Sequence, residues 1–207
     1  MIFIVTGKMA SGKTTFVNRM EQLGVHRILT VTTRPKRKTE KETDYKFVSQ
    51  ETFDFLKQNG MFLETAEYNA DFGFCCYGSL RKDYLEHKDP SIIVLTPSGI
   101  SEVRKELPRS KYKVIFLDYD WPERLDRAIK RGDKQAEINR RFRTDDEDFR
   151  EFINNKEYDY IINDNNSRYH ISTKILKRLK KGGKNESKKD NKDIENAKQP
   201  ASEDIFV

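Results

Sequence analysis

Short apolar runs alternate along most of the chain with stretches of helical periodicity. The runs read "IFIVT", "RILTV", "SIIVLT", "YKVIFLD" and "YDYII". They are short and rich in β-branched residues, which is typical of strands buried on both faces of a parallel sheet.

The segments between these runs place apolar residues on one face of a helix. After the first run, Phe16, Val17, Met20 and Leu23 share a helical face. Three later sets follow the same spacing: Ile100, Val103 and Leu107; Leu125, Ala128 and Ile129; Ile171, Ile175 and Leu179. Strands that alternate with helices predict an α/β fold of three layers with a parallel sheet at its core.

The composition changes at Gly182. The stretch "GGKNESKKDNKDIENAKQPASED" mixes charges of both signs and contains almost no apolar residue. Such a segment buries too little surface to offset the entropy cost of ordering it. We therefore predict that residues 182–207 form a disordered, charged tail.

The composition of the whole chain indicates one sizeable domain. Of the 207 residues, 35% are hydrophobic and 36% charged, and thirteen Phe and nine Tyr are enough for a core. The formal charge of +6 fits a polyanionic partner, either nucleotide phosphates or nucleic acid. Solvated lysines and a basic tail would account for the charge equally well.

The cysteines favour a reducing compartment. The two are adjacent, Cys75 and Cys76, and lack the CxxC spacing of metal and redox sites. We predict free thiols and a cytoplasmic location. The first apolar run is too short for a signal peptide, and no stretch approaches the roughly 20 apolar residues of a membrane span.

The strongest motif is "GKMASGKT", which begins at Gly7 directly after the first predicted strand. It matches G-x-x-x-x-G-K-[ST], a loop whose glycines let successive N–H groups point at phosphate oxygens. Lys13 is placed for the β- and γ-phosphates, and the Thr14 hydroxyl for Mg²⁺. The predicted ATP contacts are Gly7, Lys8, Met9, Ala10, Ser11, Gly12, Lys13, Thr14 and Thr15. The motif does not say whether the phosphate goes to water, a protein or a small acceptor.

A second basic segment, "TTRPKRK", is a candidate for the acceptor. Arg34 and Arg37 lie three residues apart beside Pro35, which stiffens the loop and lets both guanidinium groups face one anion. Tyr45 adds a hydroxyl for the same oxygens. The same residues also fit a solvated or nucleic-acid-binding loop.

The combination "TTRPKR…DYKFVS…FLE…YGS" resembles the acceptor site of guanylate kinases, which transfer phosphate from ATP to GMP or dGMP. The likeness runs from the first strand to about Arg178. It implies a phosphate-loop (P-loop) NTPase core over residues 1–29 and 87–181, with a helical lid at about 122–150. It also implies a small domain over residues 30–86 that binds the nucleoside monophosphate.

The resemblance assigns roles to individual residues. Arg34, Arg37, Tyr45 and Tyr77 would hold the phosphate of the monophosphate. Glu64 would accept hydrogen bonds from guanine N1–H and the 2-amino group, because guanine presents two adjacent donors on that edge. Ser79 and Thr30 would meet O6 and N7.

The donor side follows in the same way. Arg127, Arg131 and Arg141 match the arginines of a mobile lid, which would neutralise charge on the transferring phosphoryl group together with Lys13. Asn163 and Asp164, in "IINDN", resemble the loop that contacts the adenine of ATP. ATP and Mg²⁺ are the cofactors that this implies.

The sequence departs from the family at the base pocket. Guanylate kinases carry two aspartates after the strand that here reads "SIIVL", one near the guanine and one near the metal. This chain has Thr96, Pro97 and Ser98 instead, and "NADFGFCCYGS" is longer than the usual link between "FLE" and "YG". Asp118 could supply the missing carboxylate beside the phosphate loop, but a role in capping a helix is the favoured interpretation of this residue. The altered pocket and the lysine- and asparagine-rich tail are compatible with a phage-type member.

Three alternatives remain open. A kinase of the same fold could act on another (deoxy)nucleoside monophosphate or on a ribose bisphosphate, although "TTRPKR…DYKFVS" favours a nucleotide. A non-catalytic binding module usually has a degraded phosphate loop, whereas Lys13 and Thr14 are intact here. A nucleic-acid-binding ATPase is indicated by charge alone. The predicted partner is thus a nucleoside monophosphate, with no membrane or nucleic acid, and no feature of the sequence specifies an oligomeric state.

Overall fold

The computed structural model describes residues 1–36, 41–42, 44–70 and 73–196, with only the backbone described for residue 70 and residues 181–196. Arg37, which the sequence predicts in the acceptor site, lies outside the described residues.

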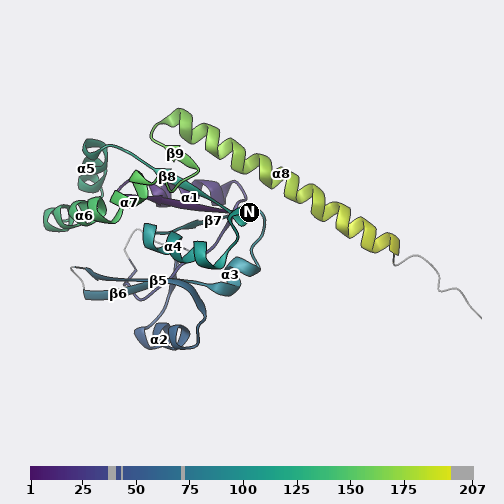
Figure 1. Cartoon of the computed structure of the whole chain (residues 1–207), viewed down its shortest axis with the longest axis horizontal. Helices are drawn as coiled ribbons and strands as arrows, with labels where there is room; N and C mark the ends of the chain where they lie inside the picture. The colour runs from purple at the N-terminus through teal and green to yellow at the C-terminus, as the bar shows by residue number, and fades with distance from the viewer. Residues whose placement is uncertain (37–40, 43, 71–72, 197–207) are drawn as a thin grey trace, which may run out of the picture.

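A parallel sheet forms the centre of the fold (Figure 1). Its strands, in spatial order, are β2 (His26–Arg27), β7 (Ser91–Val94), β1 (Ile2–Gly7), β8 (Tyr112–Leu117) and β9 (Tyr160–Ile162). Val5 of β1 pairs with Val94 on one side and Ile115 on the other, and every pairing in this sheet is parallel. The phosphate loop therefore begins at the carboxyl edge of a central strand, where ligands bind in open α/β sheets.

Two helices cover one face of this sheet. They are α1 (Lys13–Gln22) and α8 (Asn165–Asn196). Their buried residues form one core with alternate residues of β1: Phe3, Val5, Phe16, Val17, Met20, Ile171 and Ile175. Leu23, expected on the same helical face, follows the end of α1 and is 37% exposed.

Two further helices cover the opposite face, which completes the three layers. They are α4 (Pro97–Glu106) and α7 (Arg150–Asn154), and a 3₁₀ turn, η1 (Arg109–Lys111), leads into β8. The core on this side includes Ile2, Ile4, Ile100, Val103, Val114, Phe116, Phe149 and Phe152. The alternation of Ile2 and Ile4 with Phe3 and Val5 shows that β1 is buried on both faces, as the apolar run predicts.

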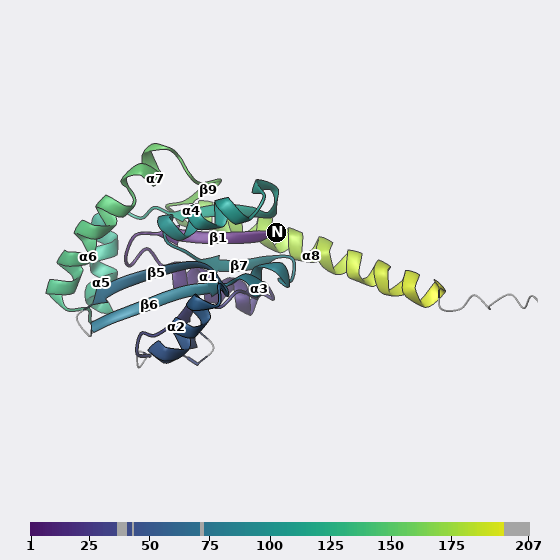
Figure 2. The ribbon, with the colours of Figure 1, turned by 60° about the horizontal axis from the view of Figure 1, so that its bottom comes forward.

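A second sheet of mixed direction lies beside the core sheet. In spatial order it contains β4 (Lys46–Phe47), β3 (Val31–Thr32), β6 (Gly73–Leu80) and β5 (Phe62–Ala70). The helix α2 (Gln50–Gln58) covers the face turned away from the core sheet (Figures 1 and 2), and α3 (Arg81–Leu85) follows β6. The expected single strand "RILTV" is wrong: β2 ends at Arg27 and β3 begins at Val31, because the chain crosses from one sheet to the other between them.

The segment expected to form a lid contains α5 (Trp121–Lys130) and α6 (Gln135–Asp148). The prediction of which residues of α5 face inward is only partly confirmed. Ala128 is fully buried and Leu125 partly buried, but Ile129 is 55% exposed and Arg124 is buried. A charged residue therefore occupies the inner side of α5, where it faces the phosphate loop.

The helix α8 continues to Asn196. Residues 182–196 are therefore helical in the structure, whereas the sequence predicts disorder for them. Adding residues to an existing helix costs little, because only nucleation is strongly unfavourable. The second half of α8 projects away from the body of the molecule (Figure 1). The expected tail beyond it, 197–207, lies outside the described residues.

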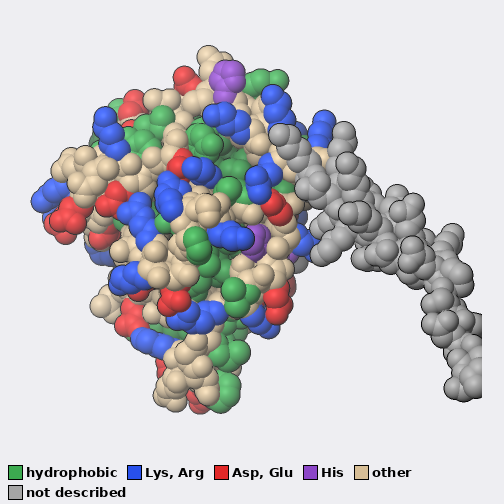
Figure 3. Space-filling view, turned by 45° about the vertical axis from the view of Figure 1, so that its right-hand side comes forward, with side chains coloured by type: hydrophobic (Ala, Val, Ile, Leu, Met, Phe, Trp, Pro, Cys, Tyr) green, Lys and Arg blue, Asp and Glu red, His purple; other side chains and the backbone are tan. Residues whose placement is uncertain are grey.

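The described surface mixes charges of both signs. On the face in Figure 3, Lys and Arg side chains are interspersed with Asp and Glu over the compact part of the molecule. Among the described residues, no helix is long and apolar enough to cross a bilayer.

Candidate active site

Backbone conformation and contacts with backbone carbonyl groups shape the phosphate loop. Gly12 has a φ of +89° and sits immediately before α1, in a conformation that favours glycine. A Cβ on Gly7 would lie 2.7 Å from the carbonyl oxygen of Leu117, so the loop approaches β8 too closely for a side chain. Lys13 Nζ donates to the carbonyl oxygens of Gly7 at 2.5 Å and Lys8 at 2.9 Å.

The surroundings of Lys13 disfavour the charged form of its ammonium group. Burial lowers the pKa of its ammonium group to about 8, and the nearby carboxylate of Asp145 opposes this shift. The guanidinium groups of Arg141, Arg131 and Arg124 lower it further. An anionic ligand in the loop would offset both the desolvation and the repulsion, so the site favours a bound phosphate.

One cavity of about 610 Å³ joins the phosphate loop, the second sheet and the lid. The sequence-predicted residues that line it are Gly7, Met9, Ala10, Gly12, Lys13, Thr14, Thr15, Thr30, Arg34, Tyr45, Glu64, Tyr77, Arg127, Arg131 and Arg141. Residues from three distant parts of the sequence thus meet around one space that is large enough for small molecules.

Arg34 is buried at the acceptor side of this cavity. Its Nε donates to the Tyr77 hydroxyl at 2.9 Å, and its guanidinium carbon lies 5.4 Å from the centre of the Tyr45 ring. The backbone N–H of Arg34 donates to the Thr32 hydroxyl at 3.1 Å, which fixes the loop to β3. Arg34, Tyr45 and Tyr77 therefore form one contact group at the edge of the cavity.

Glu64 is a buried acid on β5. Its Oε1 accepts a hydrogen bond from the Ser79 hydroxyl at 2.6 Å, and Ser79 Oγ lies 2.8 Å from the Tyr84 hydroxyl. A Cβ on Gly99 would lie 3.0 Å from Glu64 Oε2. Burial raises the pKa of the Glu64 carboxyl, although the bond from Ser79 lowers it. Ser79 is fully buried and is not among the residues that line the cavity, so it donates to Glu64 and does not face the space where the sequence predicts its contact with O6 and N7 of the base.

The long link between "FLE" and "YG" extends a β-hairpin over the cavity. Tyr68 of β5 pairs with Cys75 of β6, and its ring meets the edge of Tyr77 at 5.6 Å. Tyr68 and Thr96 both line the cavity, and burial raises the pKa of the Tyr68 hydroxyl to about 12. Thr96 caps α4 by accepting from the Gly99 N–H at 3.2 Å, with Pro97 in the first turn. Two hydroxyl-bearing side chains, Tyr68 and Thr96, thus border the cavity on the side of Glu64.

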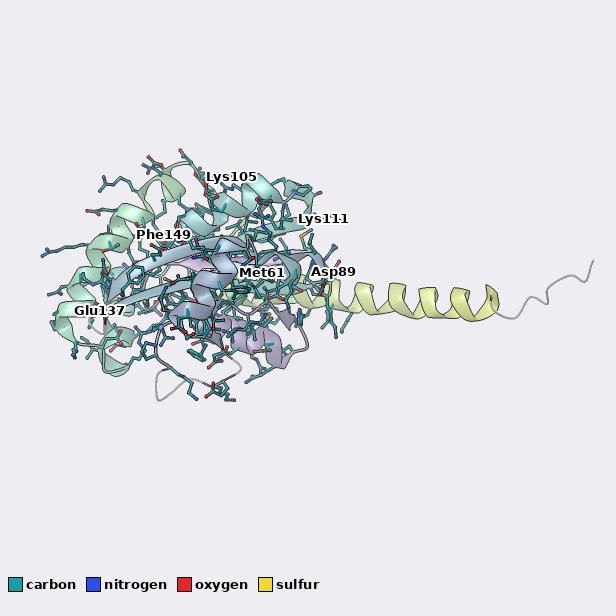
Figure 4. All side chains as sticks on the ribbon, turned by 90° about the horizontal axis from the view of Figure 1, so that it is seen from below. Met61, Asp89, Lys105, Lys111, Glu137 and Phe149 are labelled. Carbon is teal, nitrogen blue, oxygen red and sulfur yellow. The ribbon has the colours of Figure 1, made fainter. Side chains whose placement is uncertain are left out.

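The three lid arginines line the cavity, and each is held by an acid close in sequence. Arg127 pairs with Glu123 at 2.5 Å and stacks on Tyr119 at 4.2 Å. Arg131 Nε donates to Asp133 at 3.0 Å. Arg141 pairs at 2.5 Å with Glu137, which lies near the outer end of α6 (Figure 4).

Sequence reasoning missed two residues that join the lid to the loop. Asp145 Oδ2 accepts a hydrogen bond from the Met9 backbone N–H at 2.5 Å. Arg124 lies 3.7 Å from Asp145 and stacks on Phe142 at 4.6 Å. The i, i+3 spacing of Arg124 with Arg127 could have indicated a common face, whereas no pattern distinguishes Asp145 within the acidic run "DDED".

Three other candidates, Asn163, Asp164 and Asp118, are not among the residues that line the cavity. Asn163 and Asp164 are exposed at the start of α8, where Asp164 accepts the Ser167 N–H at 2.6 Å as a helix cap. This bond lowers the pKa of Asp164. Asp118 is exposed at the end of β8. Arg168, which sequence reasoning did not single out, lies closer to the loop: its Nη2 would be 3.9 Å from a Cβ on Gly12.

The side-chain oxygens near the phosphate loop suit a hard cation that takes the rest of its ligands from water and phosphate. Thr14 is exposed and lines the cavity, as Asp145 and Asp148 do. Over the described part of the chain, no group of three or more His, Cys, Asp or Glu could hold a metal. Mg²⁺ suits this arrangement, because it is usually bound by few protein oxygens together with water and phosphate.

Known proteins resemble this chain over most of its length. A family model described as guanylate kinase matches residues 3–181. The guanylate kinase of Tropheryma whipplei (strain Twist) is 32% identical over 151 residues, which cover 70% of this chain and 76% of that protein. The guanylate kinase of Synechococcus sp. (strain CC9311) is 34% identical over 167 residues, with 77% and 83% covered.

A solved structure agrees with the sequence matches. The crystal structure of guanylate kinase from Anaplasma phagocytophilum superposes with a TM-score of 0.61 at 26% identity and covers 84% of each chain. The residues matched by the family model, 3–181, include the parallel sheet, the phosphate loop and the segment with the acceptor residues. This chain belongs to the guanylate kinase family.

Proposed function

We propose that this chain transfers the γ-phosphoryl group of ATP to GMP or dGMP and releases ADP and the guanosine diphosphate. The observation that carries the proposal is the single cavity in which Lys13 and the lid arginines face the group of Arg34, Tyr45, Tyr77 and Glu64. Phosphoryl transfer needs two nucleotides held in line, and one shared cavity lined by both groups of residues supports that arrangement.

The donor phosphates would occupy the loop. The backbone N–H groups of the loop and the start of α1 favour an anion, and Lys13 would leave its carbonyl partners to contact the β- and γ-phosphates. Thr14 would hold Mg²⁺, which supplies positive charge on the phosphate oxygens when bound. Arg127, Arg131 and Arg141 would stabilise charge on the transferring group.

The acceptor phosphate would meet Arg34, Tyr45 and Tyr77. The Nε of Arg34 is already held by Tyr77, so the guanidinium group is oriented before the ligand arrives. Arg37 is proposed to join this group, on the strength of the family motif.

The base would be read by Glu64. Ser79 occupies Oε1, so the remaining lone pairs of the carboxylate, mainly on Oε2, are those left to accept from N1–H and the 2-amino group of guanine. Thr30 also lines the cavity and is proposed to face the other edge of the base. Tyr68 and Thr96 offer neutral acceptors for the 2-amino group in place of a carboxylate.

Closure of α5 and α6 over the donor would exclude water, which directs the phosphoryl group to the acceptor and not to hydrolysis. Asn163 and Asp164 are proposed to meet the adenine only in such a rearranged state. The proposed location in the cytoplasm rests on the two free cysteines, Cys75 and Cys76.

An ADP-release assay over all ribo- and deoxyribonucleoside monophosphates tests the proposal. We expect ATP turnover with GMP and dGMP, and at most weak turnover with AMP, CMP and UMP. A control without acceptor should release little ADP. Preferential use of another base would overturn the guanine assignment, and the absence of acceptor-dependent turnover would overturn the kinase assignment.

A further inference from the structure

Asp145 places a carboxylate against the phosphate loop. Its Oδ2 accepts from the Met9 N–H at 2.5 Å, and its side chain is 18% exposed. Met9 itself is buried against Ala128, Ile138 and Phe142 of the two lid helices. The loop and α6 are therefore joined by both an apolar contact and this hydrogen bond.

The charges around Asp145 are those that the donor phosphates would use. Lys13, Arg124 and Arg141 each lower the pKa of Asp145, although burial raises it overall. In the structure as it stands, Asp145 neutralises part of this positive charge. It also occupies one backbone N–H of the phosphate loop.

A carboxylate in this place would repel a second anion. Phosphate groups entering the loop would lie within a few ångströms of Asp145, where the interaction between two negative charges is weakly screened. Mg²⁺ bound to the phosphates removes most of that repulsion, since it cancels two of their negative charges. The penalty thus falls mainly on nucleotide that carries no metal.

Given the proposed donor site, we infer that Asp145 determines the specificity of the phosphate loop for the magnesium-bound nucleotide over the metal-free nucleotide. The neighbouring Asp146 differs in position but not in charge. It pairs with Lys8 at 2.5 Å, and its side chain is 65% exposed. Asp146 therefore lacks the contact with the loop backbone that the inference requires.

Calorimetric titration with ADP, once with Mg²⁺ and once with EDTA, tests this inference. The quantity to compare is the ratio of the two dissociation constants for the full-length chain, Asp145→Asn and Asp146→Asn. Asparagine can still accept from the Met9 N–H, so Asp145→Asn removes the charge and keeps the hydrogen bond. Asp145→Ala is the second variant, and thermal unfolding verifies that each variant is folded.

We expect Asp145→Asn to tighten metal-free ADP about tenfold and Mg·ADP much less, so that the ratio falls. Asp146→Asn should leave the ratio within about twofold of the unaltered chain, because exposed charges are screened. An unchanged ratio in both Asp145 variants, with ADP still bound, would overturn this inference and leave the proposed function standing. Failure of the unaltered chain to bind ADP in either buffer would overturn both.

Discussion

The donor half of the cavity is organised by backbone, and the acceptor half by paired side chains. In the donor half, Gly7 and Gly12 shape the loop and Lys13 is bound to two carbonyl oxygens. In the acceptor half, Arg34 is held by Tyr77 and Glu64 by Ser79. A backbone site tolerates little change in sequence, whereas a site of paired side chains can be altered one pair at a time.

The two halves also carry opposite buried charges. Burial lowers the pKa of Lys13 to about 8 in the donor half and raises the pKa of Glu64 in the acceptor half. Burial therefore disfavours the charged form of each group, and a ligand with complementary charge or hydrogen-bond donors would offset that cost. Phosphate would do so for Lys13, and the N–H donors of a base would do so for Glu64.

The largest expected effect comes from the donor half. Lys13→Ala should lower kcat by about a hundred- to a thousandfold, because the variant loses the charge aimed at the transferring phosphoryl group. The measurement is steady-state turnover with ATP and GMP, together with thermal unfolding. Lys105→Ala is the control, since Lys105 pairs with Glu102 on α4 at the outer surface (Figure 4). Near-normal turnover in a folded Lys13→Ala variant would contradict the kinase assignment.

A change at Glu64 should separate base reading from phosphate binding. Glu64→Gln replaces two acceptor oxygens with one acceptor and one donor, so kcat/KM for GMP should fall about ten- to a hundredfold. Poor substrates such as AMP should change little, because they lack the paired donors. Glu67→Gln on the same strand is the control, since Glu67 pairs with the exposed Lys57. The same order of substrates and rates in both variants would refute the role of Glu64.

The dependence on pH should run in opposite directions for the two halves. Lys13 is charged below its lowered pKa of about 8, so the affinity for ADP should fall as the pH rises through that value. Glu64 is charged above its raised pKa, so kcat/KM for GMP should fall as the pH drops through a value higher than that of an ordinary glutamate. The slopes should approach about tenfold per pH unit beyond each pKa. Losses on the same side of neutrality for both quantities would contradict the assignment of charges.

The smallest effect should come from the end of the chain. Removing residues 182–207 should leave Tm and turnover almost unchanged, because the buried residues Ile171 and Ile175 of α8 precede the cut. Circular dichroism and the coupled assay check this expectation. A large drop in Tm would show that the removed segment contributes to folding.

The sequence predicts the donor half better than the acceptor half, for a physical reason. A phosphate loop is a local structure, so "GKMASGKT" between a strand and a helix already specifies its form. Four of the five apolar runs form strands of the core sheet, because a short apolar run rich in β-branched residues favours a strand. The three-layer fold follows from these two features.

What the sequence did not predict depends on contacts between distant segments. The split of "RILTV" follows from the crossing between two sheets, and the burial of Arg124 from the packing of α5 on Met9. The bond from Met9 to Asp145 joins residues 136 positions apart. Tyr68 lines the cavity, and its place there depends on the pairing of β5 with β6, which the sequence of either strand alone does not specify.

The most direct measurement of the central claim follows the fate of the γ-phosphate. The chain is incubated with ATP labelled at that position, Mg²⁺ and GMP, and the labelled products are separated. The label should appear in GDP in proportion to the ADP formed, with little inorganic phosphate whether or not GMP is present. Label that accumulates as inorganic phosphate, or that never reaches GDP, would contradict the account.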